Sequence, residues 1–303
     1  MPSPEPYSTA RGVEAAIKDA AKKAATADPS LDTHKRIQLE YFNRFLSRIF
    51  SEGEDSEWVL KGGASILARI PSTRSTRDLD LYRRGFTLDQ ALEDLKQLAA
   101  VDLGDHFRFE YASHEASIAA DAQPYTDGYR VVFNIFIGVA TKGSVQIDLA
   151  VGTGMTDEVQ TSLPVTALDL PRLINNRYRL YPVVDQIADK VCATMADYDG
   201  RPSSREKDLV DIVVFAVTQD IDGAALSLAI ETERHCRGME PFERFVVPAT
   251  WGTGYMRQSK PVPHCADYST VELAAEVASR LIDPALVGEV HGKIWSAGLR
   301  RWH

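Results

Sequence analysis

Asp78 and Asp80 are the residues whose type and spacing most directly suggest chemistry. They lie in the segment DLDLY, where charged and apolar residues alternate, and this alternation predicts a strand with both carboxylates on one face. Two carboxylates so close together repel each other unless a cation lies between them, and Mg²⁺ is the usual cation in phosphoryl chemistry. A solvated strand end shows the same pattern, so the pair by itself does not decide between the two interpretations.

A glycine pair, Gly62 and Gly63, follows EWVLK, which predicts a short buried strand, and precedes a short helix that Pro71 ends. Glycines at such a junction let backbone N–H groups approach a phosphate closely, at a helix start whose dipole favours anions. The spacing is not that of a Walker loop. We expect the pair to form a phosphate-facing turn. Lys61 is a minor candidate, because it ends the strand and nothing in its spacing directs it inward.

A third carboxylate, Asp148, lies in the later segment VQIDLA. Apolar residues flank it at every second position, so a strand here would point them to one side and Asp148 to the other. If this strand lies beside DLDLY, Asp148 joins Asp78 and Asp80 in a triad. Such a triad can bind two metal ions and activate a hydroxyl nucleophile for in-line attack on phosphorus.

Cationic and hydroxyl side chains accompany the carboxylates. Arg74 and Arg77 precede the aspartate pair in a short loop, where they would contact phosphate or only solvate the loop. Lys190 lies beside the apolar stripe of a predicted helix, a position from which a lysine often reaches solvent. Thr76 is expected to face the same side as the aspartate pair. We hypothesise that phosphorylation of Thr76 or Ser75 would put a dianion where a triphosphate must bind.

The elements that must position these residues indicate a mixed α/β fold. Apolar periodicity predicts helices over 12–27, 33–50 and 88–100, and strands over 106–113, 129–139 and 144–151, the last two forming a hairpin. The later segments are predicted to be helical over 183–199, 205–219, 223–236, 270–282 and 285–299, with an irregular stretch over 239–268. We therefore expect a mixed-sheet core with N-terminal helices over 1–180, and an all-helical bundle over 181–303.

Bulk composition limits the class of protein. The chain has 303 residues, of which 44% are hydrophobic and 25% charged, as in an ordinary globular protein. The net charge of −9 argues against a protein that coats nucleic acid, although two arginine-rich windows leave room for a local basic track. The longest apolar runs are too short to span a bilayer, and the N-terminal segment lacks the apolar core of a signal peptide. Three widely separated cysteines fit a reducing compartment, so we expect a cytoplasmic protein with no membrane partner.

Taken together, these segments resemble the polymerase-β-type nucleotidyltransferase superfamily. Its pattern is Gly-Gly or Gly-Ser, then a helix, Asp-x-Asp on a strand, and a third Asp on a later strand. The wider combination is similar to the AbiEii/AbiGii-type toxins of type IV toxin–antitoxin systems, which include the mycobacterial MenT-like proteins. The segments that carry this resemblance are LKGGASILAR, RSTRDLDL, QIDLA, DQIADKVCA and REKDLVDIV, within residues 34–217.

The resemblance implies a role for each matching position. Asp78 and Asp80 would bind a metal ion, Mg²⁺ or Mn²⁺, and Asp148 would be a metal ligand or a base. Lys190 would contact the nucleotide phosphates, and Asp211 would be a functional acid near the nucleotide or the lysine. The nucleotide-binding positions would be Gly62, Gly63, Ser65, Arg74, Thr76, Arg77, Lys190, Arg205 and Asp208, the last also being the second choice for the functional acid.

The activity implied by the resemblance is transfer of a nucleoside monophosphate from an NTP to an RNA acceptor, with release of pyrophosphate. The implied acceptor is the 3′ end of tRNA, where added nucleotides block charging, and a cognate antitoxin protein would restrain the toxin. Two alternatives stay open, namely transfer to a protein hydroxyl and a non-catalytic nucleotide- or antitoxin-binding module. A metal-dependent glycosyltransferase also uses Asp-x-Asp, but the glycine pair and the Lys190–Asp211 pair disfavour it.

Overall fold

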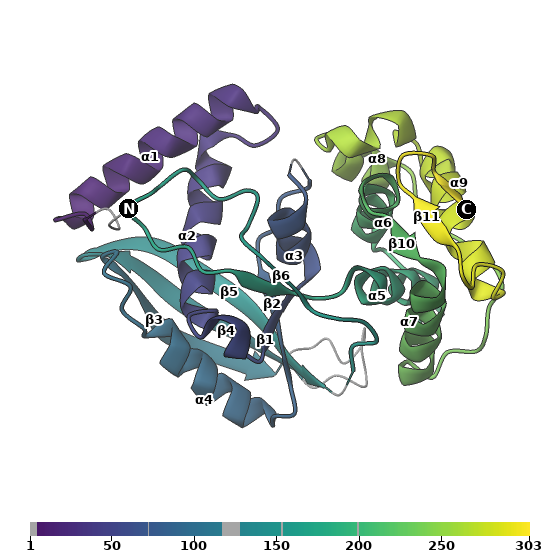
Figure 1. Cartoon of the computed structure of the whole chain (residues 1–303), viewed down its shortest axis with the longest axis horizontal. Helices are drawn as coiled ribbons and strands as arrows, with labels where there is room; N and C mark the ends of the chain where they lie inside the picture. Colours follow the sequence, from purple (N-terminus) through teal and green to yellow (C-terminus); the bar gives the residue numbers. More distant parts are fainter. Residues whose placement is uncertain (1–4, 72, 117–127, 153, 199) are drawn as a thin grey trace.

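A computed structural model describes residues 5–71, 73–116, 128–152, 154–198 and 200–303. A β-sheet with helices on it makes up one half of the molecule, and a set of helices makes up the other (Figure 1). Both halves are built around hydrophobic cores of their own, which share the short helix α3 (Gly62–Arg69). The fold is therefore the predicted mixed α/β class.

The helices beside the sheet form where the apolar periodicity predicts them. They are α1 (Ala10–Ala27), α2 (Thr33–Ile49) and α4 (Leu88–Ala99), preceded in each case by a side-chain cap from Thr9, Asp32 or Thr87. The cap of α4 is a full capping box, because Gln90 also bonds back to the Thr87 backbone N–H. A single 3₁₀ turn, η1 (Gly53–Asp55), connects α2 to the sheet.

The main sheet has seven described strands in the order β3-β4-β5-β2-β1-β7-β6. They are β1 (Trp58–Lys61), β2 (Leu79–Arg84), β3 (Phe107–Ala116), β4 (Gly128–Ile137), β5 (Ala140–Gly152), β6 (Gln160–Ser162) and β7 (Tyr178–Leu180). The sheet is mixed, since β2 runs parallel to β5 and β1 parallel to β7, while the other pairs are antiparallel. The predicted hairpin of β4 and β5 is confirmed.

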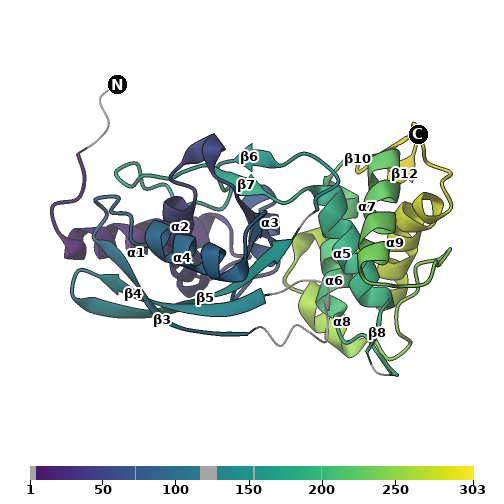
Figure 2. The same cartoon turned by 90° about the horizontal axis from the view of Figure 1, so that it is seen from below.

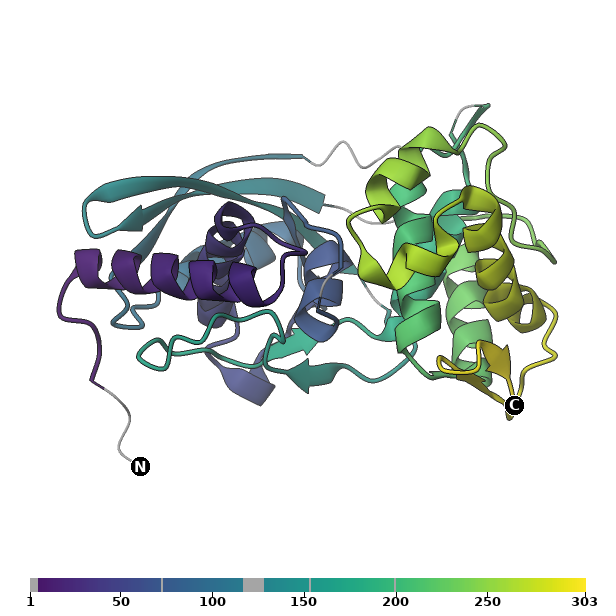
Figure 3. The ribbon, with the colours of Figure 1, turned by 90° about the horizontal axis from the view of Figure 1, so that it is seen from above.

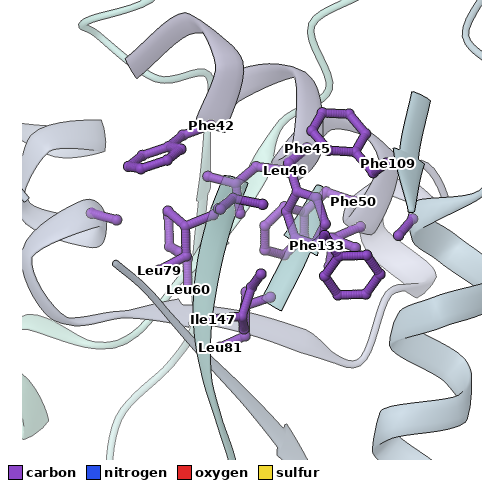
Figure 4. Close-up of a cluster of buried hydrophobic side chains, with 14 of the residues drawn as sticks. Phe42, Phe45, Leu46, Phe50, Leu60, Leu79, Leu81, Phe109, Phe133 and Ile147 are labelled. Atoms are coloured by element: carbon purple, nitrogen blue, oxygen red, sulfur yellow. The ribbon is translucent and has the colours of Figure 1, made fainter. Parts of the chain in front are cut away.

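One face of this sheet is the core. Side chains at alternate positions of the central strands, such as Leu60, Leu79 and Ile147, pack against Phe42 and Phe45 of α2 (Figure 4). The intervening positions of the same strands point to the opposite face. Because the core takes one set of positions, the polar residues between them are all presented on the other face.

The second half contains the helices α5 (Val183–Met195), α6 (Glu206–Thr218), α7 (Gly223–Cys236), α8 (Thr253–Ser259) and α9 (Val271–Leu286), with a 3₁₀ helix η3 (Pro263–Tyr268). It also contains the short strands β8 (Asp197–Tyr198), β9 (Arg201–Pro202), β10 (Ile221–Asp222), β11 (Ile294–Ser296) and β12 (Arg301–Trp302). The expectation of an all-helical second half is therefore wrong. The boundary near residue 180 stays a prediction, and it falls between β7 and α5.

The predicted helix over 285–299 is also wrong. Gly288 and Gly292 adopt positive φ angles of 74° and 76°, so the chain turns twice there and enters β11. The apolar residues that suggested a helix instead pack separately, with Val290 and Trp295 fully buried against the neighbouring helices. Within 239–268, which was expected to be irregular, the structure has α8 and η3.

Helix α3 connects the two halves. It lies between the sheet and the C-terminal helices in the views of Figures 2 and 3. Ala64 and Ala68 pack into the sheet core, whereas Ile66 and the following Ile70 pack into the core of α5–α9. No helix in the described ranges has the length and apolar character needed to cross a membrane.

Candidate active site

The sheet register brings two of the predicted carboxylates side by side. Asp80 of β2 pairs directly with Asp148 of β5 in a parallel register, so the prediction that these strands are neighbours is confirmed. Val145, Ile147 and Leu149 are buried on the core face, and Asp148 therefore lies on the opposite face with Asp80. Asp78 precedes β2 by one residue.

Negative charge accumulates at Asp80. Burial, followed by the charges of Asp78 and Asp148, raises the pKa of Asp80 to about 6. Lys207 and Lys61 oppose this shift without cancelling it. At Asp80, therefore, the nearby cations do not offset the combined effect of burial and of the two neighbouring carboxylates.

Two of the carboxylates have defined partners. The hydroxyl of Thr76 donates a 2.9 Å hydrogen bond to Oδ1 of Asp78, as expected for a threonine on the same side. Arg130, which lies opposite Asp148 on β4, donates from Nε and Nη2 to both oxygens of Asp148 at 3.0 and 3.3 Å. Arg130 was not predicted, and only the strand register reveals its position.

The glycine pair begins α3 immediately beside this cluster. Gly62 has a positive φ of 61°, and a Cβ at this position would collide with the Asp80 carboxylate. At Gly63, a Cβ would lie 3.2 Å from Thr76 and 3.4 Å from Nη1 of Arg74. Gln186 of α5 fixes the turn by donating a 2.7 Å hydrogen bond to the Gly62 carbonyl. No described side chain caps α3, so its first N–H groups have no side-chain partner, and the helix begins next to Asp80 and Arg74.

A buried chain of ion pairs crosses from the sheet half to the C-terminal helices. Lys190 is only 4% exposed, and its Nζ lies 2.7 Å from Oδ2 of Asp211 and 3.3 Å from Oδ1 of Asp208. Arg74 donates from Nε to Oδ1 of Asp211 at 2.8 Å and from Nη2 to Oδ2 at 2.7 Å, so it shares Oδ2 with Lys190. Arg205 binds Asp208 at 2.5 Å. Lys190 thus does not reach solvent, and its described contacts are carboxylates.

This chain stays charged despite its burial. Burial alone would raise the pKa of Asp211, but Arg74 and Lys190 outweigh it and hold that pKa below its usual value. Asp208 behaves alike, since Lys190 and Arg205 outweigh the effect of burial and lower its pKa. The pKa of Lys190 is raised, because Asp211 and Asp208 outweigh the desolvation that would lower it. These groups are therefore fixed charges at neutral pH.

Some predicted positions lie differently. Ser65 is fully buried within α3, and its hydroxyl accepts a 2.7 Å hydrogen bond from Arg69, one turn later in the same helix. The hydroxyl is thus bonded within α3 and not to the glycine turn. Arg77 is exposed on the loop. Of the two hydroxyls considered for phosphorylation, Ser75 is exposed, whereas Thr76 is 7% exposed and bonded to the aspartate beside it.

The side chains of Asp78, Asp80 and Asp148 are of the chemical type that binds a divalent cation, although they do not converge on one point. In the described part of the chain, no three acidic, histidine or cysteine side chains already converge as metal ligands. Thr76 is bonded to one oxygen of Asp78, and Arg130 is bonded to both oxygens of Asp148. The repulsion between Asp80 and its neighbouring carboxylates indicates a cation site, because a bound cation would relieve it. Carboxylate oxygens are also the ligands that Mg²⁺ and Mn²⁺ prefer.

A mixed sheet with paired aspartates beside a glycine-initiated helix is the arrangement that the resemblance to nucleotidyltransferases implies. Comparison with known proteins gives the family. A family model described as "Nucleotidyl transferase AbiEii toxin, Type IV TA system" matches residues 44–278. The chain therefore belongs to the AbiEii family of nucleotidyltransferase toxins.

The chain was also compared with curated proteins and with solved structures. No curated protein matches the chain significantly. The structure is similar to that of JHP933 from Helicobacter pylori, with a TM-score of 0.44 and 16% identity over 85% of this chain and 95% of that one. A second solved structure, described as a candidate nucleotidyltransferase from H. pylori, has a TM-score of 0.43 and 18% identity over 84% of this chain and 97% of that one.

Proposed function

We propose that this chain is a metal-dependent toxin that transfers a nucleoside monophosphate from an NTP to an RNA, with the 3′ end of tRNA as the acceptor. Adding nucleotides there would prevent charging and stop translation, and a cognate antitoxin protein would restrain the activity. The observation that carries the proposal is the cross-strand pairing of Asp80 with Asp148 on one sheet face, with the pKa of Asp80 raised by burial and by its neighbours, directly beside the start of α3, which has no side-chain cap.

The side chains around the cluster divide into groups with distinct proposed roles. Asp78, Asp80 and Asp148 would hold Mg²⁺ or Mn²⁺, which when bound polarises the α-phosphate and favours ionisation of the attacking hydroxyl. The first N–H groups of α3 and the Nη1 edge of Arg74, which points to Gly63, would bind phosphate oxygens.

The buried ion pairs have a positioning role in this scheme. Two of the three nitrogens of Arg74 are committed to Asp211, so its guanidinium plane is fixed relative to α3. Lys190 also donates to Oδ2 of Asp211, at 2.7 Å. We propose that Lys190 and Asp211 act on the nucleotide largely through Arg74, with the lysine charge adding to the positive potential over the phosphates.

The chemical step is a displacement at phosphorus. The acceptor hydroxyl oxygen forms a bond to the α-phosphorus, and the bond from that phosphorus to the oxygen bridging to the β-phosphate breaks. Pyrophosphate leaves with the electron pair of the broken bond. The hydroxyl proton passes to a carboxylate oxygen of Asp148 and then to solvent, a general-base role that a carboxylate beside the acceptor can fill.

The test is transfer of label from each α-labelled NTP to purified tRNA and to total RNA with Mg²⁺, using the wild type and Asp80→Asn. We expect lengthened RNA with the wild type and none with the variant. Label appearing in protein instead would contradict the RNA acceptor and favour transfer to a protein hydroxyl. No transfer to any acceptor, with growth inhibition unchanged in Asp80→Asn, would favour a non-catalytic binding module.

A further inference from the structure

Lys61 lies in a row of charged residues that crosses the sheet on the site face. It pairs with Asp80 across β1 and β2, Asp80 pairs with Asp148, and Asp148 pairs with Arg130 across β5 and β4. Residues directly opposite each other on neighbouring strands project to the same face. The expectation that nothing directs Lys61 inward is therefore wrong, because the register of β1 with β2 places its side chain on the face of the carboxylates.

Aromatic rings hold the Lys61 ammonium. Its Nζ lies 4.3 Å from the ring centroid of Tyr181 and 5.4 Å from that of Tyr82, and both tyrosines are about 5% exposed or less. The nearby carboxylates Asp148 and Asp189 form their ion pairs with Arg130 and Arg237, although the charge of Lys61 acts on Asp80 and Asp189. Cation–π contacts of this kind are weaker than a charge-assisted hydrogen bond to phosphate, so the ammonium can be drawn from the rings by a phosphate ligand.

Two other cations close to the carboxylates, Arg130 and Arg74, are already committed. Arg130 is bonded to both oxygens of Asp148, and Arg74 gives two of its three nitrogens to Asp211. Lys61 is half-buried, so its charge is screened by solvent less than that of a fully exposed lysine. It also immediately precedes Gly62, so its backbone leads directly into the turn that begins α3.

We propose that Lys61 is a phosphate-binding residue for the NTP, resting against Tyr181 and Tyr82 until the nucleotide arrives. This inference rests on the proposed function, because it assigns a further residue to the same nucleotide site. The ligand recognised is the polyphosphate chain, and the base and sugar are not contacted. The interaction should therefore grow with the number of phosphates and be absent for a nucleoside.

The experiment compares binding of each NTP and the matching NMP, with Mg²⁺ and without RNA, by isothermal titration calorimetry. Lys61→Met removes the charge but keeps a flexible stem that packs on the two rings, and Lys61→Arg keeps the charge. We expect NTP affinity to fall roughly 10- to 100-fold in Lys61→Met, as for loss of one charge-assisted contact. NMP affinity should change far less, and Lys61→Arg should restore most of the NTP affinity. Lys18→Met, on the exposed face of α1, is the matched control.

The outcomes separate the two proposals. A wild type that binds no NTP contradicts the proposed function itself. A wild type that binds NTP, with Lys61→Met binding it equally well, overturns only the Lys61 inference. Equal losses of NTP and NMP affinity would also overturn it, because they would show that Lys61 shapes the site instead of binding phosphate. If Lys61→Met has a lowered melting temperature, Lys61→Gln provides the uncharged variant.

Discussion

Replacing Asp80 with Asn should make the metal-free protein more stable while abolishing nucleotide transfer. At neutral pH the ionised Asp80 is crowded by burial and by Asp78 and Asp148, which together raise its pKa from 3.8 to about 6. A raised carboxyl pKa means that folding disfavours the charged form. Asn has nearly the same shape without the charge, so the variant should escape this unfavourable interaction.

The size of the expected gain in stability follows from the pKa shift of Asp80. A difference of about two pKa units corresponds to roughly 3 kcal/mol, at about 1.4 kcal/mol per unit. Asp80 is partly accessible to solvent, which screens the repulsion, so we expect a gain of about 1–2 kcal/mol in the free energy of unfolding. The gain should be complete at pH 8, where Asp80 is ionised in both folded and unfolded states. It should decline as the pH falls from about 6 to about 4, because the folded carboxyl then takes up its proton first.

The assay is urea denaturation of both proteins in EDTA at pH 8, 6 and 4.5, repeated at pH 8 with Mg²⁺. Added Mg²⁺ should stabilise the wild type and leave Asp80→Asn unchanged. The difference in the free energy of unfolding between the two proteins should therefore narrow or change sign. Asp19→Asn, an exposed change on α1, controls for charge removal in general. If Asp80→Asn is less stable than the wild type at pH 8, or if the difference does not depend on pH, the proposed repulsion is absent.

Further predictions concern the neighbours of the carboxylate cluster. Arg130→Ala frees Asp148 and should tighten Mg²⁺ binding by up to about fivefold, measured by calorimetric titration, since exposed ion pairs contribute up to about 1 kcal/mol. Asp211→Ala removes the carboxylate that pairs with Arg74 and the nearer of the two that hold Lys190, and should lower the free energy of unfolding by roughly 3–5 kcal/mol in urea. Gly62→Ala should cost more than the roughly 1–3 kcal/mol of positive-φ strain, because its methyl group also collides with the neighbouring carboxylate, and transfer activity should fall with stability.

A contradicting result or a control variant tests each of these three predictions. Weaker Mg²⁺ binding by Arg130→Ala would show that the arginine orients its aspartate for the metal instead of competing with it. Glu93→Ala breaks an exposed pair with Lys96 and should change stability by less than about 1 kcal/mol, in contrast to Asp211→Ala. Gly53 has a φ of 65° and nothing near its notional Cβ, so Gly53→Ala measures the backbone strain alone. Equal effects at Gly53 and Gly62 would mean that the close approach of the carboxylate is unimportant.

The sequence by itself determined the local elements and the chemical type of the site. Apolar spacing located the helices and strands of the sheet half, because that half buries one regular face of each element. The Asp-x-Asp pair and the glycine pair were recognisable because their chemistry depends on residues that are close together in sequence. The same reasoning failed at 285–299, where glycines with positive φ angles broke an apolar pattern that resembled a helix.

Only the tertiary structure decided which distant residues meet. The register of β1, β2, β5 and β4 set Lys61, Asp80, Asp148 and Arg130 in one row, and a shift of one residue would have sent each to the other face. Burial likewise turned Lys190 from an apparent surface lysine into part of an ion-pair network, because packing of α5 against α6 leaves its ammonium no path to solvent. Strand pairing and helix packing join segments far apart in the chain, and a single sequence does not record which segments those are.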